Sequence, residues 1–366
     1  MKITNIETFC VSVPLKKPFK TALRTVTEAE AVMVKIEAEE LVGFGEAPPT
    51  VVITGESLAS INSAIQHVIK PKLIGMNLTE YESIFHQLHN AMIGNTSAKA
   101  AVDMAIYDLI SKKSSLPLYQ FLGGYRNTMQ TDYTVSVNDP NEMANDAVQY
   151  IEDGFTILKV KVGKDTIQND LNRIREIRKR IKNNACIRLD ANQGWTPKEA
   201  IYAIRQMEEE GLNIELVEQP VHRKDLEGLK KVTDAVLTPI MADESIFSPQ
   251  DALQVIQMRA SDLINIKLMK SGGIHQALKI NALAETAGME CMVGSMIESR
   301  VGITAAAHFA ASQRNITRFD FDAPLMFRDD LVQGGVHYRR NVMTFTETPG
   351  LGIHTIEKDG MTIGID

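Results

Sequence analysis

Long apolar runs and export signals are missing from this chain. No segment approaches the roughly 20 apolar residues of a membrane-spanning helix. The first residues, MKITNIETFCVSVP, alternate apolar and polar positions as a strand does, which is not the pattern of a signal peptide. Basic residues are outnumbered, and a formal net charge of −7 argues against nucleic acid or an anionic membrane as the main partner. These absences predict a soluble globular protein with neither partner.

Cysteine is also scarce. Cys10, Cys186 and Cys291 are odd in number, far apart and placed in strand-like runs. We therefore expect buried, reduced thiols in place of disulfides or metal ligands, and a cytoplasmic location.

Five ionisable residues recur along the middle of the chain, and each closes a short apolar run. They are Lys161, Asp190, Glu218, Asp243 and Lys267, separated by steps of 24 to 29 residues. One strand–helix unit takes about that much chain, so the pattern predicts successive parallel strands with an ionisable group at each carboxyl end. In a (β/α)8 barrel these ends meet at one mouth, where catalytic groups lie.

The length of the chain predicts more than one domain. At 366 residues it exceeds a bare barrel of roughly 250 residues. Residues 1–115 combine alternating strands with helix patterns and predict an α+β domain, in which residues 14–28 form a polar, proline-punctuated loop. Residues 116–325 predict the barrel, and residues 326–366 predict a turn-rich segment that returns to the N-terminal domain.

Three of the strand-end residues are carboxylates. Asp190, Glu218 and Asp243 offer hard oxygen ligands from adjacent strands, which suits Mg²⁺. No histidine closes one of these runs, which argues against a zinc hydrolase. The alternative is that these carboxylates are salt-bridge partners at the barrel mouth.

Lysines accompany the carboxylates on both sides of the predicted barrel. Lys159 and Lys161 are two residues apart, so their side chains share one face of a strand. Crowding and desolvation inside a barrel would lower a lysine pKa, which is how lysine becomes a general base. Lys267 ends the sixth strand, across the barrel, so lysines would flank a substrate from two sides, as 1,1-proton transfer requires. The alternative is a pair of solvated lysines on an exposed edge.

Six segments of the chain, taken together, match a known pattern. They are Lys159-Val160-Lys161, Asp190-Ala191-Asn192-Gln193-Gly194-Trp195, Val217-Glu218-Gln219-Pro220, Ala242-Asp243-Glu244-Ser245, Asn265-Ile266-Lys267 and Pro117-Leu118-Tyr119-Gln120-Phe121-Leu122-Gly123-Gly124. In these segments the chain resembles the enolase superfamily, in its muconate-lactonizing-enzyme subgroup, over essentially its whole length.

That resemblance implies an N-terminal capping domain over a modified (β/α)7β barrel of the TIM type, which is an α/β fold. It also implies one Mg²⁺ per subunit and removal of a proton α to a carboxylate. Lys161 and Lys267 would be the acid–base pair, and Lys159 would support the charge of the enediolate. Glu244 would support the metal ligands. Asn192 and Asn265 share strand faces with Asp190 and Lys267 and are expected to do the same, and the alternative is that they are ordinary asparagines of strand–helix loops.

The segment Asp320-Phe321-Asp322, at the predicted eighth strand, resembles the Asp-x-Asp motif of dipeptide epimerases. Residues at i and i+2 put both carboxylates on one side, where they can pair with the α-ammonium group of a substrate. The alternative is an ordinary charged loop after the last strand.

Two further segments bear on the substrate. Ser295, Met296, Ile297 and Glu298 follow the seventh strand in a run that also resembles these enzymes, and with Thr134 of the first strand they are expected to contact the substrate. In the L-Ala-D/L-Glu epimerases an arginine of the first capping loop pairs with the glutamate side chain of the substrate. Arg24 is the candidate here, and its alternative is a solvated loop arginine.

The expected activity is Mg²⁺-dependent epimerisation of L,L-dipeptides, of the L-Ala-L-Glu type, at the Cα of the C-terminal residue. We expect a small dipeptide as the partner, a homo-oligomer, and murein-peptide recycling as the context. One alternative is another reaction of the subgroup, N-acylamino-acid racemisation or o-succinylbenzoate synthesis, which an ammonium-binding pair argues against. The other is a non-catalytic peptide-binding protein, which would have no need of two flanking bases.

Overall fold

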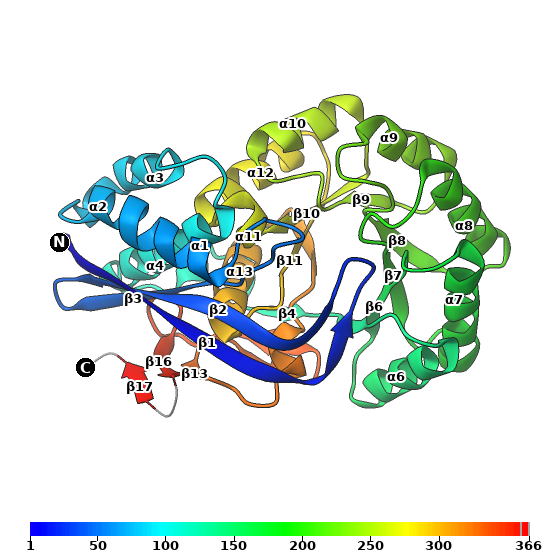
Figure 1. Cartoon of the computed structure of the whole chain (residues 1–366), viewed down its shortest axis with the longest axis horizontal. Coiled ribbons are helices and arrows are strands. Elements are labelled where there is room, and N and C mark those ends of the chain that lie inside the picture. The colour runs from blue at the N-terminus through cyan, green and yellow to red at the C-terminus, as the bar shows by residue number, and fades with distance from the viewer. Residues whose placement is uncertain (359–360, 365–366) are drawn as a thin grey trace.

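A curled parallel sheet of eight strands forms the centre of the molecule, with helices around it and a second α+β region to one side (Figure 1). The computed structural model describes residues 1–358 and 361–364, so the predicted segment 326–366 lies partly outside the described residues. No helix in the described part of the chain is long and apolar enough to cross a membrane.

The N-terminal region is a three-stranded antiparallel sheet covered by helices. Its strands are β1 (Ile3–Lys20), β2 (Thr25–Ala38) and β3 (Leu41–Ala47). Its helices are α1 (Leu58–Ser63), the π-helix η1 (Ala64–Ile69), α2 (Lys70–Leu73), the 3-10 helix η2 (Leu78–Glu80), α3 (Tyr81–His89) and α4 (Thr96–Lys113). Helix α4 packs closely on β3. A Cβ atom at Gly45 would lie only 1.8 Å from the Ala101 carbonyl oxygen, so no larger residue fits there. The small residues of α4 and the glycines of β3 therefore allow this contact.

The prediction of a loop over residues 14–28 is wrong. These residues extend the β1–β2 hairpin, with Pro14 opposite Glu28 and Lys20 opposite Thr25. β1 is an edge strand of its sheet, so its prolines do not remove a hydrogen bond that the ladder needs. The hairpin reaches the barrel (Figure 1), where the Lys20 carbonyl accepts a hydrogen bond from the Val137 N–H at 3.1 Å. Contacts of this kind outweigh the local turn signals.

The central sheet follows the chain in strict order, and all its neighbouring strands are parallel. Its strands are β5 (Tyr133–Val135), β6 (Ile157–Lys161), β7 (Cys186–Asp190), β8 (Ile214–Glu218), β9 (Ile240–Ala242), β10 (Leu263–Lys267), β11 (Cys291–Gly294) and β12 (Ile316–Phe319). The helices between and after them are α6 (Pro140–Glu152), α7 (Ile167–Ile181), α8 (Pro197–Glu209), α9 (Leu226–Ala235), α10 (Pro249–Met258), α11 (Leu268–Ser271), α12 (Ile274–Thr286) and α13 (Arg300–Ser312). The spacing of the strand-end residues thus predicted the strands correctly, and the predicted fold class is confirmed.

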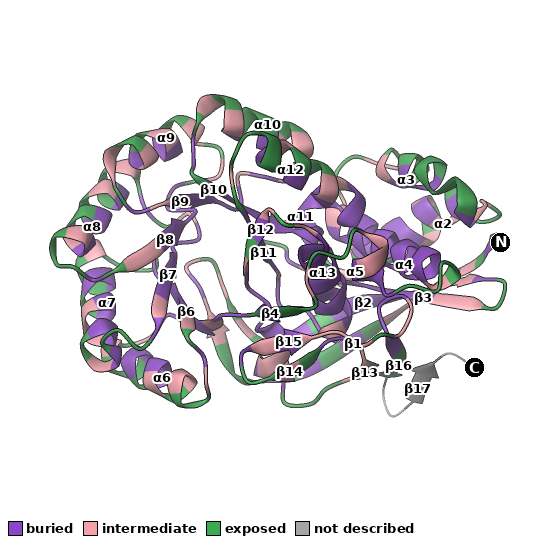
Figure 2. Cartoon of the chain, turned by 180° about the vertical axis from the view of Figure 1, so that it is seen from behind, coloured by how far each residue is buried: buried purple, intermediate pink, exposed green. Residues whose placement is uncertain are grey.

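Burial follows this layering. The strands of the central sheet and the inner faces of the helices are buried, whereas the outer faces of α7 to α10 are largely exposed (Figure 2). Three of the outer helices begin with the same signal: Asp139, Thr196 and Ser248 cap α6, α8 and α10, each with a proline in the first turn.

Polar groups join the two edges of the curled sheet. In the described residues no strand ladder pairs β12 with β5. The Phe321 N–H donates to the Thr131 Oγ1 at 2.8 Å, and the Thr134 N–H donates to the Asp322 Oδ2 at 2.6 Å. The Asp132 N–H also donates to the Phe319 carbonyl oxygen, at an N···O distance of 3.4 Å. The eighth strand is therefore held to the first mainly by side-chain hydrogen bonds.

The remaining elements connect the two regions. They are α5 (Leu118–Phe121), β4 (Thr128–Gln130), the 3-10 helix η3 (Ala323–Met326), β13 (Val332–Gly334), β14 (His337–Arg339), β15 (Val342–Thr344), β16 (Ile353–Lys358) and β17 (Met361–Gly364). They form two small antiparallel sheets, β14-β15-β4 and β13-β16-β17. The Leu351 N–H donates to the Asp108 Oδ1 of α4 at 2.8 Å, so the last part of the chain contacts the N-terminal region.

The cysteines depart from the expectation. All three are free, but only Cys291 is buried, while Cys186 is half-buried and Cys10 is exposed. Cys10 lies on the edge strand β1, where it precedes the buried Val11, so the alternation of the strand places its side chain on the solvent side.

Candidate active site

Three carboxylates lie side by side at the carboxyl ends of neighbouring strands. Asp190 ends β7, Glu218 ends β8, and Asp243 directly follows β9. Asp190 pairs in register with Glu218, and each of the three residues is at most 1% exposed. The parallel order of the strands therefore brings together the three carboxylates that the sequence singled out.

Three lysines face these carboxylates from inside the barrel. The Lys161 Nζ lies 2.6 Å from the Asp190 Oδ2, and the Lys267 Nζ lies 2.7 Å from the Asp243 Oδ2. The Lys159 Nζ lies 2.8 Å from the Glu218 Oε2 and 3.2 Å from the Asp190 Oδ2. All three lysines are buried, so the alternative of solvated lysines on an exposed edge is excluded.

The pKa values of Lys159 and Lys267 move in the direction opposite to the expectation. Burial lowers the pKa of Lys267, but Asp243, Glu218 and Asp190 together outweigh it, and the net pKa lies well above its ordinary value. For Lys159, burial is likewise outweighed by Asp320 and Glu218, and its pKa is raised. The expectation considered the lysines beside one another, whereas in this structure they point at carboxylates of other strands.

The carboxylates respond unequally to the same charges. Burial raises the pKa of Asp190, but Lys161 and Lys159 outweigh it and bring the pKa to about 2. Burial, and then the charge of Asp190, raise the pKa of Glu218 to about 7. Glu218 is therefore a buried carboxylate whose negative charge is incompletely compensated, and an additional cation beside it would be stabilised.

The donor set fits a magnesium ion, although the side chains do not converge on one. In the described residues, no group of three or more His, Cys, Asp or Glu side chains is arranged to hold a metal ion. The lysine ammonium groups contact the carboxylate oxygens instead. Three buried, hard oxygen donors are nevertheless present, from Asp190, Glu218 and Asp243. The raised pKa of Glu218 indicates that its negative charge would be stabilised by an additional cation.

The residues predicted to support the ligands lie beside them and form hydrogen bonds there. The Asn265 Nδ2 donates to the Glu218 Oε1 at 2.7 Å. The Asn192 N–H donates to the Asp190 Oδ1 at 2.9 Å, and its Nδ2 donates to the Glu244 Oε1 at 3.2 Å. These hydrogen bonds fix the orientation of the carboxylates.

A cavity opens above the lysines, between the barrel mouth and the N-terminal region. Most of the residues predicted for the site line it. They are Arg24, Thr134, Lys159, Lys161, Asn192, Asp243, Glu244, Lys267, Ser295, Met296, Ile297, Asp320 and Asp322. Asp190, Glu218 and Asn265 lie beneath this layer and do not line the cavity, as far as the described residues show.

Asp320 and Asp322 form a buried anionic pair at the wall of this cavity. The Asp320 Oδ2 lies 2.7 Å from the Lys159 Nζ. Burial raises the pKa of Asp320, but Lys159, Lys161 and Lys267 together outweigh it and lower the pKa. Burial, and then Asp320, raise the pKa of Asp322 to about 7. Both residues line the same cavity, which agrees with their spacing of two along the chain.

Glu298 does not take the place expected for it. It is 1% exposed and absent from the residues that line the cavity among those described. Its Oε1 accepts a hydrogen bond from the Met296 N–H at 2.8 Å, and burial and then Glu46 raise its pKa to about 8. Glu298 is therefore an internal support of the loop that carries Met296 and Ile297.

The sequence reasoning missed the apolar wall of the cavity. Phe19, Leu23, Val52 and Ile53 line it, and the Lys161 Nζ lies 5.8 Å from the centre of the Phe19 ring. Apolar residues in an otherwise polar loop were the available signal, but the sequence does not reveal which of them face the barrel.

Lys270 was missed as well. It is 1% exposed, and its Nζ lies 2.6 Å from the Asp243 Oδ1. Its spacing of three residues from Lys267, at the start of a helix, was the only sign of this contact.

Comparison with known proteins defines the class. The model of the mandelate racemase / muconate lactonizing enzyme N-terminal domain matches residues 3–123, and the enolase C-terminal domain-like model matches residues 142–359. The chain belongs to the mandelate racemase / muconate lactonizing enzyme family of enolase-like proteins. The domain boundaries near residues 115 and 325 stay predictions.

Its relatives are isomerases. The chain is 63% identical to the L-Ala-D/L-Glu epimerase of Bacillus subtilis (strain 168), over 96% of this chain and 97% of that one. It is 48% identical to the hydrophobic dipeptide epimerase of Enterococcus faecalis, over 96% and 99% of the two chains. The protein is accordingly an isomerase that acts on amino-acid derivatives, and the alternative of a non-catalytic binding protein is excluded.

Solved structures agree with the sequences. A substrate-liganded complex of the Bacillus subtilis epimerase has a TM-score of 0.96 at 63% identity, and covers 96% of this chain and 99% of that one. The Enterococcus faecalis V583 dipeptide epimerase, complexed with Mg and L-Leu-L-Tyr, has a TM-score of 0.92 at 48% identity and covers 96% and 99%.

Proposed function

We propose that this protein epimerises dipeptides by 1,1-proton transfer at the Cα of the C-terminal residue, with L,L-dipeptides of the L-Ala-L-Glu type as substrates. The observation that carries the proposal is one cavity lined by two lysines from opposite strands and by a pair of buried aspartates. Lys161 on β6 and Lys267 on β10 are four strands apart in an eight-stranded curled sheet, so they approach a bound Cα from two sides.

Lys161 and Lys267 are the proposed acid and base. One removes the α-proton, and the other delivers a proton to the opposite face, which inverts the centre. The lysine that acts as the base must first lose its own proton, because a protonated lysine cannot accept one. Ion pairs with Asp190 and Asp243 stabilise the protonated forms of Lys161 and Lys267. These carboxylates must therefore release the lysines, and both belong to the proposed metal-binding set.

Asp190, Glu218 and Asp243 would hold one Mg²⁺. When bound, this ion supplies positive charge next to the substrate carboxylate and so stabilises the enediolate that forms on loss of the α-proton. Lys159 lies between these ligands and Asp320 and can place a further positive charge near the same oxygens.

Asp320 and Asp322 are proposed to bind the α-ammonium group of the dipeptide. Both are buried, and a cation paired with two carboxylates there avoids the cost of an isolated buried charge. A substrate whose amino group is acylated has no charge for this pair. The pair thus argues against N-acylamino-acid racemisation and against o-succinylbenzoate synthesis.

Arg24 is proposed to bind the side chain of a C-terminal glutamate. It lines the cavity, burial lowers its pKa, and the described residues place no carboxylate within ion-pair distance of its guanidinium. A partly desolvated and unpaired guanidinium favours a ligand carboxylate. The name of the Bacillus subtilis relative, an L-Ala-D/L-Glu epimerase, supports the same substrate. Recycling of murein-derived peptides by a cytoplasmic homo-oligomer is the context we propose.

The experiment that tests this function compares two substrates with the purified protein and Mg²⁺. L-Ala-L-Glu should be converted to L-Ala-D-Glu, whereas N-acetyl-L-Ala-L-Glu at the same concentration should be a very poor substrate. Comparable turnover of the two would reject the ammonium-binding role of Asp320 and Asp322 and favour an N-acylamino-acid racemase.

A further inference from the structure

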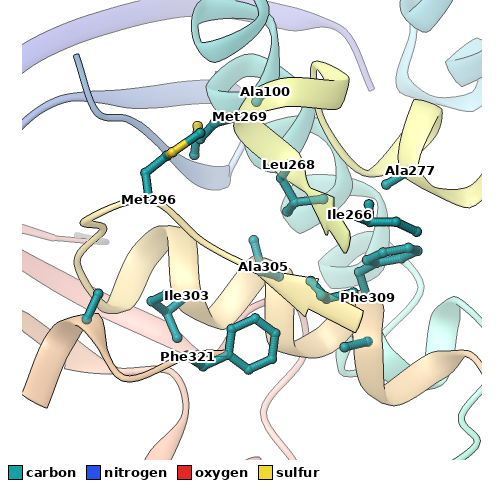
Figure 3. Close-up of a cluster of buried hydrophobic side chains, with 14 of the residues drawn as sticks. Ala100, Ile266, Leu268, Met269, Ala277, Met296, Ile303, Ala305, Phe309 and Phe321 are labelled. Carbon is teal, nitrogen blue, oxygen red and sulfur yellow. The ribbon is translucent and has the colours of Figure 1, made fainter. Parts of the chain in front are cut away.

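The residue between the two aspartates is held by its backbone from both sides. The Phe321 N–H donates to the Thr131 Oγ1 at 2.8 Å, and the Phe321 carbonyl accepts a hydrogen bond from the Tyr338 hydroxyl at 2.7 Å. The ring of Phe321 is fully buried and lies beside helix α13 near Ile303 (Figure 3). Asp320 and Asp322, on either side of this buried residue, both line the cavity.

Both supports come from one small sheet. Tyr338 is the middle residue of β14, and Thr131 directly follows β4, at the other edge of the sheet β14-β15-β4. The Thr131 N–H also donates to the Asn341 carbonyl at 2.9 Å, at the turn between β14 and β15. The sheet can therefore hold the two supports in a fixed relation to each other.

We infer that Tyr338 and Thr131 are positioning residues, which set the separation of Asp320 and Asp322 for a single substrate ammonium group by fixing the Phe321 backbone. This inference rests on the proposed function. Tyr338 does not line the substrate cavity in the described structure but a neighbouring cavity of about 1700 Å³, so it acts through Phe321 and not by touching the substrate. Burial, and then Asp322, raise the pKa of Tyr338, so its hydroxyl keeps the proton that it donates.

The position of the pair matters because two close carboxylates repel each other until a cation lies between them. The Asp322 side chain also accepts a hydrogen bond from the Thr134 N–H at 2.6 Å, and the Asp320 side chain accepts one from the Lys159 Nζ. The Phe321 backbone is the segment that connects these two side chains. If the Phe321 backbone loses one of its two hydrogen bonds, the carboxylates can move apart in the free enzyme. Binding of the ammonium group must then bring them together, which lowers the affinity.

The test measures how well the site distinguishes an ammonium group from its absence. The affinities of L-Ala-L-Glu and of propionyl-L-Glu, which lacks only the amino group, are obtained as inhibition constants against epimerisation of L-Ala-L-Ala in the presence of Mg²⁺. Tyr338→Phe removes one hydroxyl and should reduce the preference for L-Ala-L-Glu by about three- to tenfold, the range expected for one hydrogen bond. The affinity for propionyl-L-Glu should stay unchanged.

Matched variants separate positioning from general damage. Tyr119→Phe removes a hydroxyl that accepts a hydrogen bond from the Gln120 Nε2, away from the site, and should leave the preference intact. Thr131→Val should resemble Tyr338→Phe, whereas Thr131→Ser keeps the acceptor and should restore the preference of the parent protein.

The outcomes are distinct. A Tyr338→Phe protein that is folded and prefers L-Ala-L-Glu as strongly as the parent overturns the inference, and leaves the proposed function standing. A parent protein that binds both compounds equally overturns the inference and the ammonium-binding role together. If Tyr338→Phe does not fold, the comparison of Thr131→Val with Thr131→Ser decides, and equal preferences in those two proteins overturn the inference.

Discussion

At the residue scale, the site consists of charges that are buried together and neutralise one another. Lys161 and Lys267 are each within 2.7 Å of a carboxylate oxygen, and neither is more than 7% exposed. Removing one member of such a pair leaves the other buried and uncompensated, so stability has to be measured alongside activity in every variant.

The first prediction concerns the two bases. Lys161→Ala and Lys267→Ala should each reduce epimerisation by about a thousandfold or more, because inversion needs a proton donor on one face and an acceptor on the other. Conversion of L-Ala-L-Glu to L-Ala-D-Glu, followed by polarimetry, gives the rate, and thermal unfolding controls for the fold. A rate near that of the parent in either variant would reject the assignment.

The second prediction concerns the metal ligands. Asp190→Asn, Glu218→Gln and Asp243→Asn should each weaken Mg²⁺ binding and lower activity by about a hundredfold or more, since the loss of one charge-stabilising group has effects of that order. Calorimetric titration with Mg²⁺ measures binding without reference to activity. Full activity of the parent protein after treatment with EDTA, with no metal added back, would contradict the proposal.

At the element scale, the β1–β2 hairpin and helix α13 have separate tasks. The hairpin carries Phe19, Leu23 and Arg24 to the cavity, and its edge strand is fastened to the barrel at Lys17, whose Nζ lies 2.7 Å from the Asp146 Oδ1. Helix α13 fixes the linker before the barrel, because the His308 Nδ1 accepts a hydrogen bond from the Tyr119 N–H at 2.9 Å.

The third prediction follows from the hairpin. Arg24→Ala should raise the KM for L-Ala-L-Glu by about 10- to 100-fold, the range for a hydrogen bond to a charged group, and should change the KM for L-Ala-L-Ala little. The two Michaelis constants in parent and variant are the measurement. An equal loss for both dipeptides would show that Arg24 shapes the hairpin without binding a glutamate side chain.

The fourth prediction concerns α13 and pH. Burial lowers the pKa of His308 to about 3, whereas a histidine in the unfolded chain has a pKa near 6.5. Between these values the unfolded chain binds the extra proton, so the stability present above pH ~6.5 is lost as the pH falls toward ~3. His308→Asn keeps an acceptor but does not titrate. The free energy of unfolding, measured with urea, should therefore fall between pH 7 and pH 5 by up to about 2 kcal/mol more in the parent than in the variant. Equal falls would contradict a neutral, buried His308.

At the scale of the whole molecule, the fold was largely predictable because its strongest constraints are periodic. Strand-end residues recur with the length of one strand–helix unit, and buried strands must be apolar, so the spacing alone was enough to place Asp190, Glu218 and Asp243 together. The hairpin was missed because Pro14 and Pro18 give a local turn signal, and only contact with the barrel decides otherwise.

The parts of the site that could not be predicted depend on distances between strands. The raised pKa of Lys267 comes from Asp243 on another strand, and the raised pKa of Glu298 depends on burial and on its neighbour Glu46 from the N-terminal region. Which apolar residues of the capping loops, such as Val52, face the cavity is set by how that region docks on the barrel. These contacts join residues that are far apart in the chain and do not recur at a regular spacing, so the sequence pattern does not predict them.

The central claim is that two lysines exchange the α-proton of the C-terminal residue with solvent while inverting that centre. Epimerisation of L-Ala-L-Glu in D₂O with Mg²⁺, followed by ¹H NMR and mass spectrometry, tests it most directly. The expected product is L-Ala-D-Glu that carries one deuterium, at the glutamate Cα, with the alanine Cα unlabelled. Deuterium at the alanine Cα, or L-Ala-D-Glu that retains the hydrogen of the substrate, would contradict it.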